Sequence, residues 1–127
     1  MLSFKDPHSA DEWADLHPTL RSVLLWLHSI WPTAAMVVTR IQFPTVAGES
    51  GVHQTSPHRA ADVRTNDLSI QEGDSIAASV NAAFDYGDGK HSVALQHGLG
   101  PSRHLHLQVR NETRRKVAND EPIEKET

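Results

Sequence analysis

The sequence predicts a small α+β domain with a mostly antiparallel sheet and flanking helices. Two segments space their apolar residues as helices do, and four short segments have the composition or alternation of strands. Their order is helix, strand, strand, helix, strand, strand, which is typical of α+β domains. A chain of 127 residues has room for one domain.

Start and stop signals place the helices. The first begins at Pro18, whose fixed φ suits the first helical position, and ends before Pro32. The second follows a capping box formed by Ser69 and Glu72 and continues to Phe84. A short helical turn is expected over residues 9–16. Strands are expected over residues 34–43, 59–65, 92–96 and 104–109.

The last part of the chain is polar. Residues 111–127 contain only three apolar side chains, those of Val117, Ala118 and Ile123. We therefore expect one domain over residues 1–110 and a flexible C-terminal tail over residues 111–127.

Composition excludes several classes of function. The net charge of −4 and the scattered Lys and Arg residues argue against nucleic-acid binding. The longest apolar stretch is interrupted by His28 and is too short to cross a membrane. Residues 1–8 show no signal peptide, so we expect synthesis in the cytoplasm. The chain has no cysteine, so a metal would need His, Asp or Glu.

Histidine is the unusual component of the composition. The chain has nine, and a histidine-rich segment beside acidic residues favours a metal site, although surface histidines are also common. Six of the nine lie from residue 53 onward, namely His53, His58, His91, His97, His104 and His106.

Two of these histidines are placed side by side by strand periodicity. In His104-Leu105-His106, both imidazoles point to one face of the strand and Leu105 points to the other. One ring could then bind a metal while the other lies beside it. Such a pattern also arises by chance, and two solvent-facing histidines on an edge strand are the alternative.

Asp62 lies in the middle of an apolar strand, where an unpaired carboxylate is costly to bury. It could form an ion pair with Arg40, Arg59 or Arg64, or it could bind a cation. His53 stands upstream, and two imidazoles with one carboxylate leave a fourth position open, as in catalytic zinc sites. Calcium and magnesium prefer sites made of oxygen ligands.

The segment 51–65, GVHQTSPHRAADVRT, and the later HLHLQV of residues 104–109 resemble the zinc D-Ala-D-Ala carboxypeptidase/endolysin group of peptidases, especially short phage-encoded members. The resemblance covers about residues 34–110. It implies that zinc is held on the sheet by His53, Asp62 and His106. It also implies that the substrate is peptide bonds of bacterial peptidoglycan and that the protein is associated with a virion or released to the cell wall.

This sequence departs from the family pattern at two points. His58 occupies the position of a glycine and stands four residues before Asp62, as in lysostaphin-type peptidases, so it is the alternative to His53 as a ligand. Arg103 replaces the usual carboxylate base. The resemblance then assigns the base to His104, with His97 as second candidate. Arg40 resembles an arginine that stabilises the oxyanion in related enzymes.

Two other classes compete with a peptidase. One is a catalytically inactive virion or assembly protein, with virion proteins as partners, that keeps the fold and the metal. The other is a cupin-type iron oxygenase, which also uses His-x-His. Cupins carry a glutamate shortly after the histidine pair, whereas Leu107, Gln108 and Val109 follow here.

Overall fold

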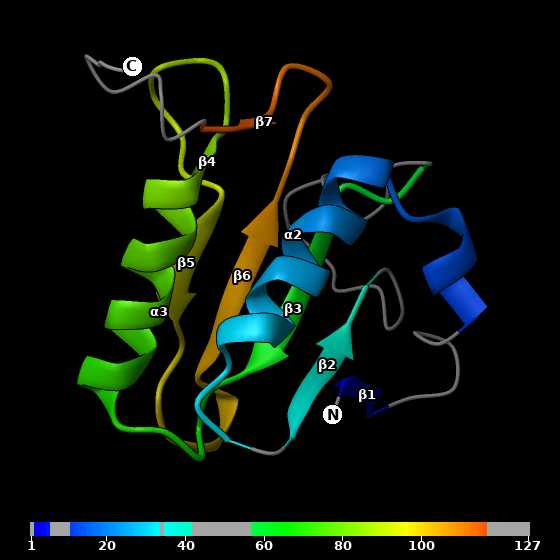
Figure 1. The fold of residues 1–127 in the computed structure, drawn as a ribbon. Coiled ribbons are helices and arrows are strands. Elements are labelled where there is room, and N and C mark those ends of the chain that lie inside the picture. The colour runs from blue at the N-terminus through cyan, green and yellow to red at the C-terminus, as the bar shows by residue number, and fades with distance from the viewer. Residues whose placement is uncertain (1, 6–10, 34, 42–56, 117–127) are drawn as a thin grey trace.

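The fold is known from a computed structural model, which describes residues 2–5, 11–33, 35–41 and 57–116. A five-stranded sheet has the strand order β1-β2-β3-β6-β5 (Figure 1). Its strands are β1 (Leu2–Phe4), β2 (Met36–Arg40), β3 (Ala60–Arg64), β5 (Ala94–His97) and β6 (His104–Gln108). The helices are α2 (Pro18–Ile30), α3 (Ile70–Ala83) and the 3-10 turns η1 (Trp13–Asp15) and η3 (Gly100–Ser102).

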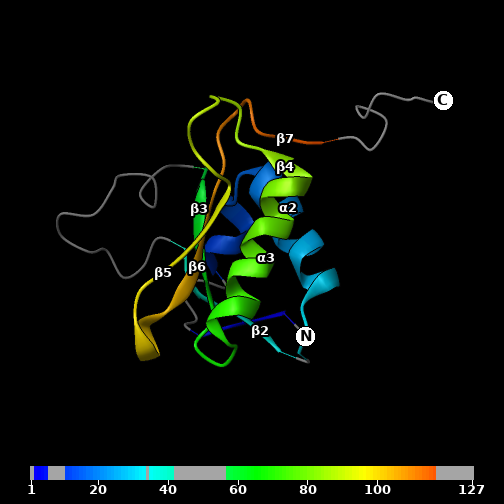
Figure 2. The same cartoon turned by 90° about the vertical axis from the view of Figure 1, so that its left-hand side faces the viewer.

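Both long helices cover the same face of the sheet (Figure 2). Leu20, Val23, Leu24 and Leu27 of α2 are buried in the core that the helices share with the sheet. The sheet contributes side chains from alternate positions of its central strands, which point toward the helices because strand side chains alternate between faces. These are Ala61, Val63, Leu105 and Leu107. The residues between them therefore lie on the face without helices.

The predicted helix starts are confirmed. Pro18 is the first residue of α2, and the His17 ring accepts a hydrogen bond from the Thr19 amide at 3.1 Å. At α3, the Ser69 hydroxyl accepts from the Glu72 amide and the Glu72 carboxylate accepts from the Ser69 amide. The hydrogen bond from the Ser69 backbone is the main reason that the pKa of Glu72 lies below its usual range.

The predicted α+β class is confirmed, but the sheet is mixed because β1 pairs with β2 in parallel. Strand β1 was not predicted, because three residues are too few to show an alternating pattern. The strand predicted over residues 34–43 is seen as β2, and Ala34, Gln42 and Phe43 lie outside the described residues. No helix in the described ranges is long and apolar enough to cross a membrane.

The first residues of the predicted tail, 111–116, are attached to the domain. Strand β7 (Arg114–Arg115) pairs antiparallel with β4 (Phe84–Asp85). Thr113 is buried, and its hydroxyl donates to the Tyr86 carbonyl at 2.7 Å. The Arg115 guanidinium lies 5.8 Å from the centre of the Trp26 ring. Composition did not reveal this pairing because backbone hydrogen bonds and a cation–π contact require no apolar side chains in the segment. Residues 117–127 lie outside the described part of the chain.

Shortening the chain tests this attachment. A variant ending at Arg110 loses β7 and the Thr113 hydrogen bond. We expect its free energy of unfolding to fall by about 2 kcal/mol, because it lacks a few hydrogen bonds that each contribute about 1 kcal/mol net. A variant ending at Lys116 serves as control and should melt as the full chain does. Thermal unfolding monitored by circular dichroism measures both. Equal melting of the two shortened chains would contradict the stabilising role of β7.

Candidate functional site

Three neighbouring strands bring four predicted site residues to one place. Asp62 on β3 lies opposite His106 on β6, and His104 on β6 lies opposite His97 on β5. Residues directly opposite each other in antiparallel strands project to the same face of the sheet. The four side chains therefore share the face that α2 and α3 leave free.

The closest polar contact in this group joins Asp62 and His106. The His106 Nδ1 atom lies 3.1 Å from the Asp62 Oδ1 atom. Asp62 is only 7% exposed, so its carboxylate is largely removed from water. Polar contacts stabilise a carboxylate at this burial, and the His106 ring supplies one of them.

A chain of hydrogen bonds determines which nitrogen of His106 carries the proton. The Gln108 Nε2 atom lies 3.1 Å from the carbonyl oxygen of Ser92, which can only accept, so the amide oxygen of Gln108 faces His106. The His106 Nε2 atom lies 3.2 Å from that amide oxygen and must donate to it. In the neutral ring, the lone pair therefore sits on Nδ1 and faces the Asp62 carboxylate.

The neighbouring histidine is oriented in a similar way. The His104 Nδ1 atom lies 2.7 Å from the carbonyl oxygen of Ser102, so Nδ1 donates and Nε2 carries the lone pair of the neutral ring. Nε2 lies 3.8 Å from the same Asp62 Oδ1 atom. Two imidazole lone pairs thus face one carboxylate oxygen. A proton or a cation between these atoms would make their interaction attractive.

His97 and Arg40 complete the group. The His97 ring is exposed, and its centre lies 4.2 Å from that of His104 and 6.0 Å from that of His106. Arg40 lies opposite Asp62 on β2 and is 8% exposed. Arg40, Asp62 and His104 line the same hollow, of about 320 Å³.

His53, the third predicted ligand, lies outside the described residues. Within the described ranges, no group of three or more His, Cys, Asp or Glu side chains is arranged to hold a metal ion. Asp62 and His106 nevertheless fit as two ligands of one ion. Zinc bonds of about 2.0–2.1 Å in a tetrahedron separate two donors by about 3.3 Å, close to the 3.1 Å seen here.

His58, the alternative ligand, occupies a buried position at the start of β3. Its amide donates to the Asp15 carbonyl and its carbonyl accepts from the His17 amide, both at 2.8 Å. Its Nε2 atom lies 3.7 Å from the Asp15 carboxylate. These contacts attach the start of β3 to the segment before α2 and give His58 a structural role.

Arg103, which the motif resemblance places at the position of a carboxylate, makes structural contacts as well. Its guanidinium donates to the carbonyl oxygens of Thr65 and Leu68, which stabilises the turn between β3 and α3. The sequence analysis missed Gln108, although its position two residues after His106 places it on the same strand face.

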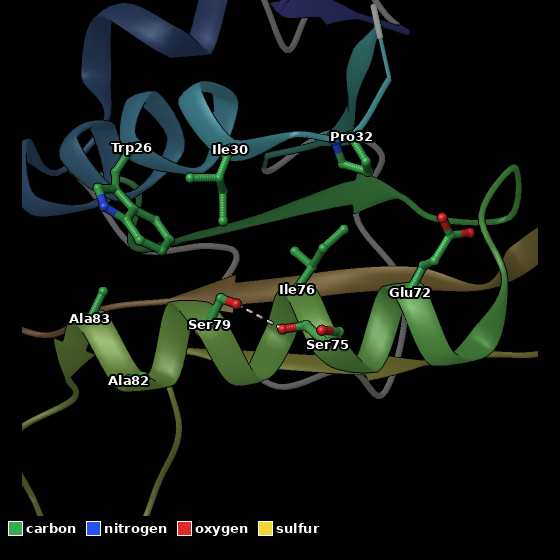
Figure 3. A pocket seen from close by; sticks show the side chains of 9 residues that line it. All are labelled: Trp26, Ile30, Pro32, Glu72, Ser75, Ile76, Ser79, Ala82 and Ala83. Atoms are coloured by element: carbon green, nitrogen blue, oxygen red, sulfur yellow. Dashed lines mark hydrogen bonds between the residues drawn. The ribbon is translucent and has the colours of Figure 1, made fainter.

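A second hollow lies on the helix side of the sheet. It has a volume of about 650 Å³ and separates Trp26 and Ile30 of α2 from Ile76 of α3 (Figure 3). Its polar groups are engaged in helix structure: Glu72 caps α3, and Ser79 donates to the Ser75 carbonyl. The titratable side chains with matched partners lie on the opposite face, and we place the functional site there.

Comparison with known proteins gives no match to a family model, to a curated protein or to a solved structure. The geometry of the cluster and the motif resemblance are therefore the two grounds on which a function can be proposed.

Proposed function

We propose that this protein is a zinc-dependent peptidase whose metal is held by Asp62, His106 and His53. The observation that supports the proposal most is the Asp62–His106 pair, in which a carboxylate oxygen and an imidazole nitrogen lie 3.1 Å apart. This separation matches that of two ligands of one tetrahedral zinc ion.

The donor types favour zinc over other common cations. Imidazole and carboxylate ligands suit zinc, whereas calcium and magnesium are bound mainly by oxygen. Three protein ligands leave one position for water or substrate, as in catalytic sites. When bound, zinc supplies Lewis acidity, which polarises a carbonyl group and makes water more acidic.

The residues around the pair can carry the proton transfers. Because Ser102 holds the Nδ1 proton of His104, the His104 Nε2 atom is free to accept a proton and pass it to a leaving amine. His97, whose ring lies beside that of His104, is the second candidate for the base. Arg40 lines the same hollow and would stabilise negative charge on the carbonyl oxygen of the substrate.

The motif resemblance narrows the substrate to peptides of bacterial peptidoglycan and the biological setting to phage or prophage lysis. It also leaves the inactive virion or assembly protein as the alternative. One observation favours that alternative: Arg103, at the position of the usual carboxylate base, binds backbone carbonyls. The two proposals predict the same metal content and opposite results in a cleavage assay.

Metal content tests the ligand set. The purified full chain should bind about one zinc per molecule, and Asp62→Ala, His106→Ala or His53→Ala should each reduce this well below one. His91→Ala is the control, because His91 is exposed and contacts Asp88 instead. The measurement is atomic absorption after dialysis. If His53→Ala keeps its zinc and His58→Ala loses it, His58 is the ligand and the proposed set is wrong.

Cleavage of peptidoglycan tests the activity. Zinc-loaded protein should release new amino groups without new reducing sugar ends, and chelation should abolish the release. His104→Ala should keep its zinc and lose roughly a hundredfold or more in turnover, as expected for a general base, whereas His91→Ala should retain full turnover. New reducing ends would identify a glycosidase, and a zinc-loaded protein without any cleavage would favour the inactive virion protein.

A further inference from the structure

The hollow beside Asp62 and His104 has an unusual charge. The chain as a whole carries a net charge of −4. Four of the residues that line this hollow are nevertheless cationic, and only Asp62 is acidic. The four are Lys5, Arg40, Arg64 and Arg103.

Two of these cations are available to a ligand. Lys5 follows β1, where its amide donates to the Val38 carbonyl, and its side chain is exposed. Arg64 is the last residue of β3 and lies opposite His104. Within the described ranges, neither side chain forms an ion pair with a carboxylate. Arg103, in contrast, is engaged by backbone carbonyls.

A concave site lined by charges of one sign raises the local concentration of ligands of the opposite sign. Basic side chains bind carboxylates through charge-assisted hydrogen bonds, which are stronger than neutral ones. A volume of about 320 Å³ is at the lower end of the range for ligand pockets. It can accept one end or one side chain of a larger ligand.

We propose that Lys5 and Arg64 bind a carboxylate of the ligand next to His104. The identification of the ligand as a peptide rests on the proposed function. The carboxylate could come from the C-terminus of the peptide or from an acidic side chain. In either case the hollow would select acidic peptides. The peptide bond next to the bound carboxylate would then lie beside the Asp62–His106 pair.

Three acetylated tripeptides distinguish the two sources of the carboxylate. The first is trialanine with a free C-terminal carboxylate, and the second is its C-terminal amide. The third is also an amide but has glutamate in place of the middle alanine. Binding to the full chain is measured by calorimetry, once without metal and once with zinc. We expect at least one carboxylate peptide to bind more tightly than the neutral amide, and its affinity to fall as salt rises. The carboxylate peptide that binds identifies the source.

Replacing Lys5 and Arg64 together by Gln should weaken binding of that peptide roughly five- to tenfold, as expected for the loss of two solvent-accessible ion pairs. The control replaces Lys90 and Arg114, which do not line the hollow, and should bind as the unchanged protein does. Equal affinity for all three peptides, or equal weakening in both double variants, would overturn the proposal. Because one titration is made without metal, either of these outcomes can be told apart from a failure of zinc binding or of cleavage.

Discussion

The contact between Asp62 and His106 depends on the register in which β3 and β6 pair. Strand side chains alternate between faces, so a slip of one residue would turn Asp62 toward the helices and bring an apolar neighbour to the site. Burial of Ala61 and Val63 on β3, and of Leu105 and Leu107 on β6, opposes this slip. The apolar layer beneath α2 and α3 therefore holds the polar cluster in place on the other face.

Hydrogen bonds to neighbouring groups orient the two histidine rings of the polar cluster. Both rings face a nearly buried carboxylate, and they cannot turn away without losing the bonds to Gln108 and Ser102. These outer partners fix the tautomer and orientation of each ring, as they do around metal ligands in general. A cation bound by these groups would couple metal binding to the stability of the fold.

Sequence reasoning succeeded where the determining interactions are local. Ser69 and Glu72 determine the start of α3 through bonds within one turn, and alternation along β6 places His104 and His106 on one face. It failed where the partner is distant in sequence. Three features depend on how separate segments meet: the parallel pairing of β1, the pairing of β7 with β4, and the lining of one hollow by both Lys5 and Arg64.

The claim that the His106 lone pair faces Asp62 can be tested most directly by long-range ¹H–¹⁵N correlation spectroscopy of the histidine rings, with and without zinc. At a pH where the rings are neutral, the account predicts a proton on Nε2 of His106 and on Nδ1 of His104. Added zinc should shift the His106 Nδ1 resonance and leave His91 unchanged. A proton on Nδ1 of neutral His106, or no response of that atom to zinc, would contradict the account.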